Sequence, residues 1–207
     1  MKNISKWDSL SIKDKADLMK LYIKNGINNL EEIRSHYNKF ATGGYTEEGK
    51  KEFIISYDTL IDKFEKSKEF QKTDEDFTQI EFNFGQAVGF KMLLDTTEQD
   101  EIIYAKRIGR DTYTRFVKTK EYYYKTSNVV FILSRNKNCK DEFYMITMFP
   151  GNRSEKEPTD KNIKNKEELE KSLKFWKDKA LIFDKSIVQQ NTILYECPYS
   201  NLLTNCN

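Results

Sequence analysis

Two runs of β-forming residues that flank a short turn most constrain what this chain can fold into. Residues 101–107 (EIIYAKR) and 113–118 (YTRFVK) both favour strand, and the tetrapeptide Ile-Gly-Arg-Asp at 108–111 separates them. Gly and Asp are typical of turns because they tolerate backbone angles that other residues avoid. The sequence therefore predicts a β-hairpin over this stretch.

A second pair of runs follows directly. Residues 128–135 contain five consecutive apolar residues, VVFIL, which is typical of a central strand buried on both faces. The polar tripeptide Asn-Lys-Asn at 136–138 predicts another turn, and residues 142–149 predict the returning strand. Together the two pairs predict a small sheet whose strands pair mainly antiparallel.

The segments on either side of this β-rich block are helical in pattern. Residues 7–44 predict two short helices, the first with a capping box formed by Ser11 and Asp14. Such a pair also occurs in helix-turn-helix DNA-binding proteins, but Glu31 and Glu32 on the second helix repel phosphate.

Residues 46–66 carry apolar side chains at spacings of three and four, which predict a helix able to pack, dock or self-associate. A further short helix is predicted at 85–94. Asn165 is expected to cap another helix, which a short strand at 180–183 follows.

These patterns predict an α+β fold: an N-terminal helical unit, then a small, mainly antiparallel sheet with a packed helix. The expected division is a helical module at 1–66, a charged linker at 67–78 and an α+β domain at 79–207.

Composition limits the class of protein. No apolar run approaches the length of a membrane span and no signal peptide is visible, so no membrane partner is expected. The three cysteines show no metal-binding spacing, which favours reduced thiols in a cytoplasmic setting. A bridge between Cys197 and Cys206 remains an alternative.

The net charge of the chain is only +2, yet residues 101–126 hold seven basic and three acidic residues, a local net charge of +4. Any attraction to a polyanion must therefore come from this patch. The basic residues are Lys106, Arg107, Arg110, Arg115, Lys118, Lys120 and Lys125.

Several catalytic classes are excluded. His36, expected on the surface, is the sole histidine, so the β-rich part cannot hold a Ser-His-Asp triad or a Cys-His pair. No phosphate-binding glycine loop and no set of metal ligands is present. We therefore expect no metal and no cofactor.

The remaining chemistry, Lys and Arg beside hydroxyl groups, suits a phosphodiester. Cleavage by the 2′-hydroxyl of RNA needs positive charge on the transition state, a base and an acid. The predicted catalytic residues are Arg110 and Arg115 as phosphate clamps, Lys106 as base or stabiliser, Thr147 as an orienting group and Tyr113 as acid. The same patch on a solvated, edge-protecting strand would need no ligand at all.

Aromatic side chains close to the patch can stack on unpaired bases. Those considered are Tyr104, Tyr113, Phe116, Tyr122, Tyr123 and Tyr124.

The N-terminal string carries a recognisable pattern: Trp7-Asp8, Lys24-Asn25-Gly26, Ile33-Arg34, Tyr37-Asn38 and Gly43-Gly44. It resembles a module at the N-termini of diverse proteins from phages of gut Bacteroides and their relatives. The resemblance implies a phage or prophage origin and a virion-associated or co-packaged protein, and it implies no chemistry.

A second pattern spans residues 84–198: YAKRIGRDTYTRFVK, an apolar strand, YMITMFPG and then FWKDKALIF. It resembles phage and toxin domains of the barnase/EndoU/colicin/RelE-like ribonuclease superfamily. The resemblance implies metal-independent RNA cleavage, and its recurring features map onto Lys106, Arg107, Arg110, Arg115 and residues 147–150. The further substrate-binding positions that we predict are Arg107, Lys118, Tyr104, Phe149 and Lys179. Lys179 stands where relatives are expected to carry a histidine, which puts catalysis in question unless Lys179 replaces it.

Three functional hypotheses follow. The first is a phage-encoded, metal-independent ribonuclease or toxin-like protein acting on RNA, in the host cytoplasm or with the virion and with an immunity protein as partner. The second is a non-enzymatic virion component or inhibitor that binds a host protein. The third is nucleic-acid binding without cleavage.

Overall fold

A computed structural model describes residues 1–5, 10–24, 53–119 and 124–203. The chain folds into two compact units, and each unit is built from two separate stretches of sequence. Unit 1 comprises residues 1–90 and 125–152, and unit 2 comprises residues 91–124 and 153–207.

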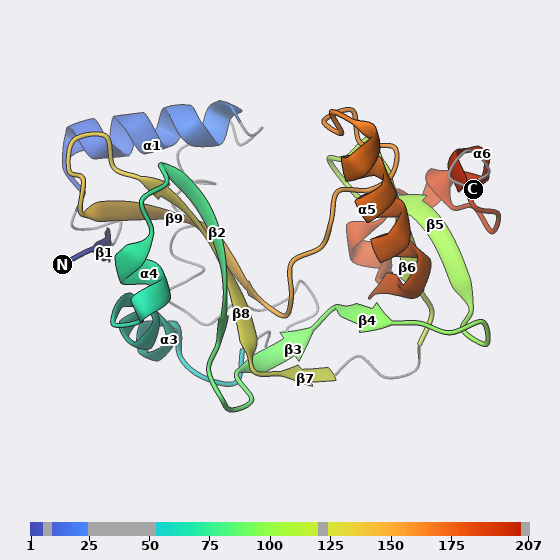
Figure 1. The fold of residues 1–207 in the computed structure, drawn as a ribbon, viewed down its shortest axis with the longest axis horizontal. Coiled ribbons are helices and arrows are strands. Elements are labelled where there is room, and N and C mark those ends of the chain that lie inside the picture. The colour runs from blue at the N-terminus through green and yellow to red at the C-terminus, as the bar shows by residue number, and fades with distance from the viewer. Residues whose placement is uncertain (6–9, 25–52, 120–123, 204–207) are drawn as a thin grey trace. The chain divides into compact units, whose positions relative to one another are not determined.

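Unit 1 is organised around a four-stranded sheet with the order β1-β9-β8-β2 (Figure 1). The long central strands β8 (Asn128–Arg135) and β9 (Glu142–Pro150) pair antiparallel, as the apolar run and its polar turn predict. β2 (Phe77–Asn83) pairs antiparallel with β8, and β1 (Asn3–Ser5) pairs parallel with β9. Residues from the start of the chain therefore complete a sheet formed some 140 residues later.

Helices pack on this sheet and bury its apolar face. α3 (Tyr57–Glu65) and α4 (Lys68–Lys72) begin at Ser56 and Ser67, whose hydroxyls accept backbone N–H bonds. α1 (Ile12–Lys24) precedes them, and just before it the Ser11 hydroxyl accepts a bond from the Asp14 N–H, as expected for the capping box.

The centre of the unit 1 core is aromatic. Phe64 of α3 stacks on Phe131 of β8, with ring centroids 3.7 Å apart and planes 3° from parallel, and both residues are fully buried. Phe70 and Phe82 also contact the ring of Phe64. This stack is the point at which the helical layer and the sheet are joined.

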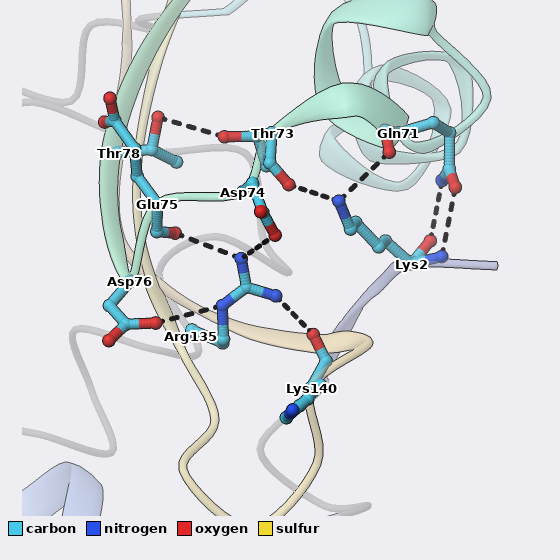
Figure 2. A network of polar contacts seen from close by, with 9 residues as sticks. All are labelled: Lys2, Gln71, Thr73, Asp74, Glu75, Asp76, Thr78, Arg135 and Lys140. Atoms are coloured by element: carbon cyan, nitrogen blue, oxygen red, sulfur yellow. Dashed lines mark hydrogen bonds and ion pairs between the residues drawn. The ribbon is translucent and has the colours of Figure 1, made fainter.

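Polar contacts tie the first residues to the end of α4 (Figure 2). The Lys2 backbone N–H donates to Gln71 Oε1 at 3.0 Å, and Gln71 Nε2 donates back to the Lys2 carbonyl at 2.8 Å. The Lys2 ammonium donates to the carbonyls of Gln71 and Thr73. These contacts satisfy carbonyls at a helix end that have no partner within the helix.

Unit 2 contains a second four-stranded sheet with the order β4-β10-β6-β5. β5 (Ile102–Lys106) and β6 (Tyr113–Val117) form the predicted antiparallel hairpin. β10 (Lys179–Ile182) pairs parallel with β6 and antiparallel with β4 (Leu93–Asp95).

α5 (Lys166–Asp178) packs on this sheet, and its N-cap is Asn165, as predicted. Leu173 and Trp176 are its buried apolar residues. The last described helix is α6 (Ser200–Leu203).

The free edge of β5 is covered by residues 185–194, which include the short 3₁₀ turns Lys185–Ile187 and Gln190–Thr192. Tyr104 and Leu194 exchange two backbone bonds of 2.7 and 2.8 Å, and the Lys106 N–H donates to Thr192 Oγ1. The 3₁₀ turns interrupt regular pairing, so this edge is covered without becoming a template for another strand.

The two remaining short strands, β3 (Gly89–Lys91) and β7 (Tyr124–Thr126), pair with each other. β3 lies where the sequence predicts a helix at 85–94, and that prediction is wrong. Apolar residues over so short a stretch fit strand and helix alike.

The α+β class is confirmed, but the helices of the N-terminal part are not a separate module, since the described ones share unit 1 with β8 and β9. Residues 67–78, predicted as a linker, hold α4 and the start of β2. In the predicted helix at 46–66, the described helix begins after Ser56. His36, Thr46 and most of the N-terminal phage-like pattern lie outside the described residues.

No helix in the described part of the chain is both long enough and apolar enough to span a membrane.

The aromatic stack predicts a large stability difference between two phenylalanines. Phe64→Ala should lower the free energy of unfolding by about 3–5 kcal/mol, because it removes a fully buried ring. Phe77→Ala, which removes a ring 52% exposed on β2, is the matched control and should change stability by less than about 1 kcal/mol. Urea unfolding followed by circular dichroism measures both, and similar losses would contradict the assigned core.

Candidate functional site

One face of the β5–β6 hairpin brings four predicted site residues together. Tyr104 pairs directly with Arg115, and Lys106 pairs directly with Tyr113. Because every second residue of a strand points to the same face, these four side chains share one side of the hairpin. The Lys106 ammonium lies 5.5 Å from the centre of the Tyr113 ring, a favourable placement for a cation.

Arg115 does not have the exposure expected of a phosphate clamp. It is only 9% exposed, and its Nη1 donates to Thr96 Oγ1 at 2.6 Å and to the Lys179 carbonyl at 3.0 Å. Arg115 thus links β6 to β10 and to the residue that follows β4. Its geometry favours a structural role.

Tyr104 is also buried, in an apolar cluster with Leu173 and Tyr199. Its ring meets that of Tyr199 edge to face, with centroids 5.5 Å apart. Burial raises the pKa of the Tyr104 hydroxyl, neighbouring Cys197 raises it further, and Arg115 lowers it.

Tyr199 has an unusual environment, because its buried hydroxyl has no hydrogen-bond partner among the described residues. Burial raises the pKa of this hydroxyl well above its ordinary value, and the nearby Tyr104 and Cys197 add to the shift.

A buried carboxylate, Glu157, holds the turn end of the hairpin. Glu157 Oε1 accepts bonds from Arg107 Nη2 at 2.6 Å and from Thr114 Oγ1 at 2.8 Å. The preceding residues are fixed by α5, since Ser172 Oγ and Trp176 Nε1 both donate to the Lys156 carbonyl. Arg107, predicted to bind substrate, therefore forms an ion pair within unit 2.

The turn itself carries Arg110 on an exposed surface. Gly109 has a φ of +73°, a conformation that favours glycine, and the Arg110 N–H donates back to the Arg107 carbonyl at 2.9 Å. Gln189 Nε2 donates to the carbonyls of Arg107 and Arg110 at 2.9 and 3.1 Å. Gln189, in the C-terminal segment, therefore holds the backbone of the turn at Arg110 in place.

A pocket of ≈ 200 Å³ lies between this turn and residues 159–162. Arg110 and Asp111 line one side, and Asp160 and Lys161 line the other. Asp160 Oδ1 already accepts two bonds from Asn162, one from its N–H and one from its side chain. The pocket thus places cations and carboxylates within one small polar space.

The other predicted residues are dispersed. Lys118 pairs with Glu101, and Lys179 pairs with Asp95. Thr147 and Phe149 lie on β9 in unit 1, so the structure does not bring them together with the hairpin residues within one unit. A β-bulge at Ile146, between the pairs Leu133–Met145 and Ile132–Thr147, precedes them.

Sequence reasoning missed Glu157, Asp111 and Gln189. The sequence indicates Asp111 only as a turn residue. Glu157 and Gln189 lie 50 and 82 residues from their partner Arg107, so no local sequence pattern connects them to it. Within the described ranges, no group of three or more His, Cys, Asp or Glu is placed to hold a metal ion.

The orphan hydroxyl of Tyr199 yields a prediction about stability. Tyr199→Phe removes a buried polar group without a partner and should raise the free energy of unfolding by about 1 kcal/mol at neutral pH. Because the pKa of Tyr199 is higher in the folded than in the unfolded chain, the tyrosine costs further stability as pH rises above about 10. The advantage of the variant should therefore grow there.

Chemical unfolding of the wild type and of Tyr199→Phe, at neutral pH and above about pH 10, measures this difference. A less stable variant at neutral pH would mean that the hydroxyl has a partner.

No protein-family model and no curated protein matches the sequence. Among solved structures, a conserved hypothetical protein from Toxoplasma gondii ME49 is similar, with a TM-score of 0.47 and 13% sequence identity. The similarity covers 65% of this chain and 87% of that protein.

Proposed function

We propose that unit 2 binds RNA at the turn end of the β5–β6 hairpin and cleaves it without a metal ion. One observation carries the proposal. Lys106 and Arg110 are the predicted site cations that form no ion pair and are not buried, counted over the described residues of unit 2. They are available to an external phosphate, whereas Arg107, Lys118 and Lys179 each have a carboxylate partner.

The proposed reaction is attack of the 2′-hydroxyl on the adjacent phosphate. The 2′-oxygen–phosphorus bond forms, the bond from phosphorus to the 5′-oxygen breaks, and a 2′,3′-cyclic phosphate remains. Arg110 and Lys106 stabilise the charge that develops on the phosphate oxygens. We assign Lys106, whose ammonium lies 5.5 Å from the centre of the Tyr113 ring, to charge stabilisation and not to proton abstraction.

The remaining proton transfers need a base and an acid. Asp111, in the pocket wall beside Arg110, is the carboxylate that we assign to take the proton of the 2′-hydroxyl. Tyr113, opposite Lys106, is assigned to protonate the leaving 5′-oxygen. Tyr104 and Arg115, which are buried, then have a structural role in holding the hairpin in place.

Nucleic-acid binding without cleavage is the second candidate. The burial of Arg115 and the internal pairing of Arg107 favour it, because they remove two of the cations that a transition state would use. The two functions make different predictions for a variant that lacks only the proposed base.

The decisive test compares three variants on labelled single-stranded RNA in EDTA. Lys106→Ala/Arg110→Ala should weaken binding and slow cleavage at least tenfold. Asp111→Asn should slow cleavage to a similar extent while RNA remains bound. Lys174→Ala, which removes one exposed cation of α5, is the control for loss of surface charge and should behave as the wild type.

Cleavage is followed on gels and binding by fluorescence anisotropy across a salt series. Cyclic-phosphate products that require Asp111 would support the nuclease. Intact but bound RNA, with affinity that falls steeply with salt, would select the binding function. Failure of the wild type to bind or cleave RNA would exclude both.

A further inference from the structure

Tyr195 stands out from the other tyrosines of the chain. It is 72% exposed, whereas every other tyrosine whose side chain the structure describes is buried or half-buried. An aromatic ring left in water loses the stabilisation that burial would give it. Tyr195 therefore adds little to the stability of the fold, and its ring is open to contact with a ligand.

The ring is held in place even though it is exposed. Leu194, the preceding residue, exchanges two backbone hydrogen bonds with Tyr104 of β5. The Lys118 ammonium lies 5.5 Å from the centre of the Tyr195 ring, and Lys118 is itself fixed by its ion pair with Glu101 and by its N–H bond to the Glu101 carbonyl. Tyr195 is thus attached to the edge of the same hairpin that carries Lys106 and Arg110.

The aromatic residues first considered for base stacking do not serve this role where the structure describes them. Phe116 is fully buried, Tyr104 is 9% exposed, and Tyr124 is half-buried with its hydroxyl beside Thr119. Tyr113 is half-buried and is already assigned as the acid of the proposed reaction. Among the described aromatic residues, a platform for a base must therefore come from outside this set.

We infer that Tyr195 is a stacking subsite for an unpaired base of RNA bound to unit 2. This inference rests on the proposed function and narrows its substrate to single strands, because a base within a duplex cannot reach an aromatic ring. Lys118 occupies one side of the ring, and the exposed remainder is available to the base.

The charge around Tyr195 indicates what part of the nucleotide it contacts. Lys118 is neutralised by Glu101, so this end of the hairpin offers little attraction to a phosphate. The contribution of Tyr195 should therefore be stacking, which is nearly independent of salt, whereas Lys106 and Arg110 supply the salt-dependent part.

The test measures binding of a short single-stranded 2′-O-methyl RNA, which has no free 2′-hydroxyl and so stays intact. Tyr195→Ala should weaken binding about fivefold or more without changing the slope of affinity against salt. Tyr195→Phe keeps the ring and should bind as the wild type. Phe77→Ala, which removes an exposed ring from unit 1, is the matched control and should have no effect.

The outcomes separate this inference from the proposed function. If Tyr195→Ala binds as tightly as the wild type while Lys106→Ala/Arg110→Ala binds weakly, the stacking subsite is wrong and the proposed function stands. If Tyr195→Phe loses as much affinity as Tyr195→Ala, the ring is not the contact. If the wild type does not bind the oligonucleotide, both the function and the subsite are overturned.

Discussion

Both units depend on strand pairing between segments that are distant in sequence. β1, at residues 3–5, completes the unit 1 sheet by pairing with β9, and β10 closes unit 2 by pairing with β6 more than 60 residues earlier. The chain therefore passes from one unit to the other after residues 90, 124 and 152. Closing such long loops has an entropic cost that only the burial of each core can offset. We therefore expect the two segments of each unit to fold together, because neither segment completes the core of its unit alone.

This constraint explains which features could be predicted from sequence. The β5–β6 and β8–β9 hairpins and the caps at Ser11 and Asn165 depend on neighbours within a few residues, so local patterns were enough. The domain division depends on distant pairing and could not be read along the chain. Residues 67–78 looked like a linker because they are rich in charge, yet Phe70 alone anchors α4 in the core. One buried ring outweighs the polar character of its neighbours.

In the candidate site, too, local sequence patterns do not show which charged side chains are free to bind a ligand. A cluster of Lys and Arg can be counted in a sequence, but the count does not say which side chains face a ligand. Glu157 reaches Arg107 from 50 residues away, and Glu101 and Asp95 pair with Lys118 and Lys179. Local excess charge therefore overstates the potential that unit 2 offers to a polyanion. The structure places Tyr104, Lys106, Tyr113 and Arg115 on one face of the hairpin, but two of the four, Tyr104 and Arg115, are buried.

This distribution of charge also bounds how unit 2 could hold RNA. Among the described residues at the turn end, the cations without a carboxylate partner are Lys106, Arg110 and the pocket residue Lys161. So few cations would neutralise only a few phosphates, so RNA bound there would be held weakly at physiological salt. A ligand held by so few phosphate contacts needs further, uncharged contacts to be retained. The covering segment at residues 185–194 links the two ends of the hairpin, because Gln189 fixes the turn of Arg110 and Leu194 fixes the position of Tyr195. A single stretch of chain thus sets the spacing between the charged and the aromatic parts of the proposed RNA-binding surface.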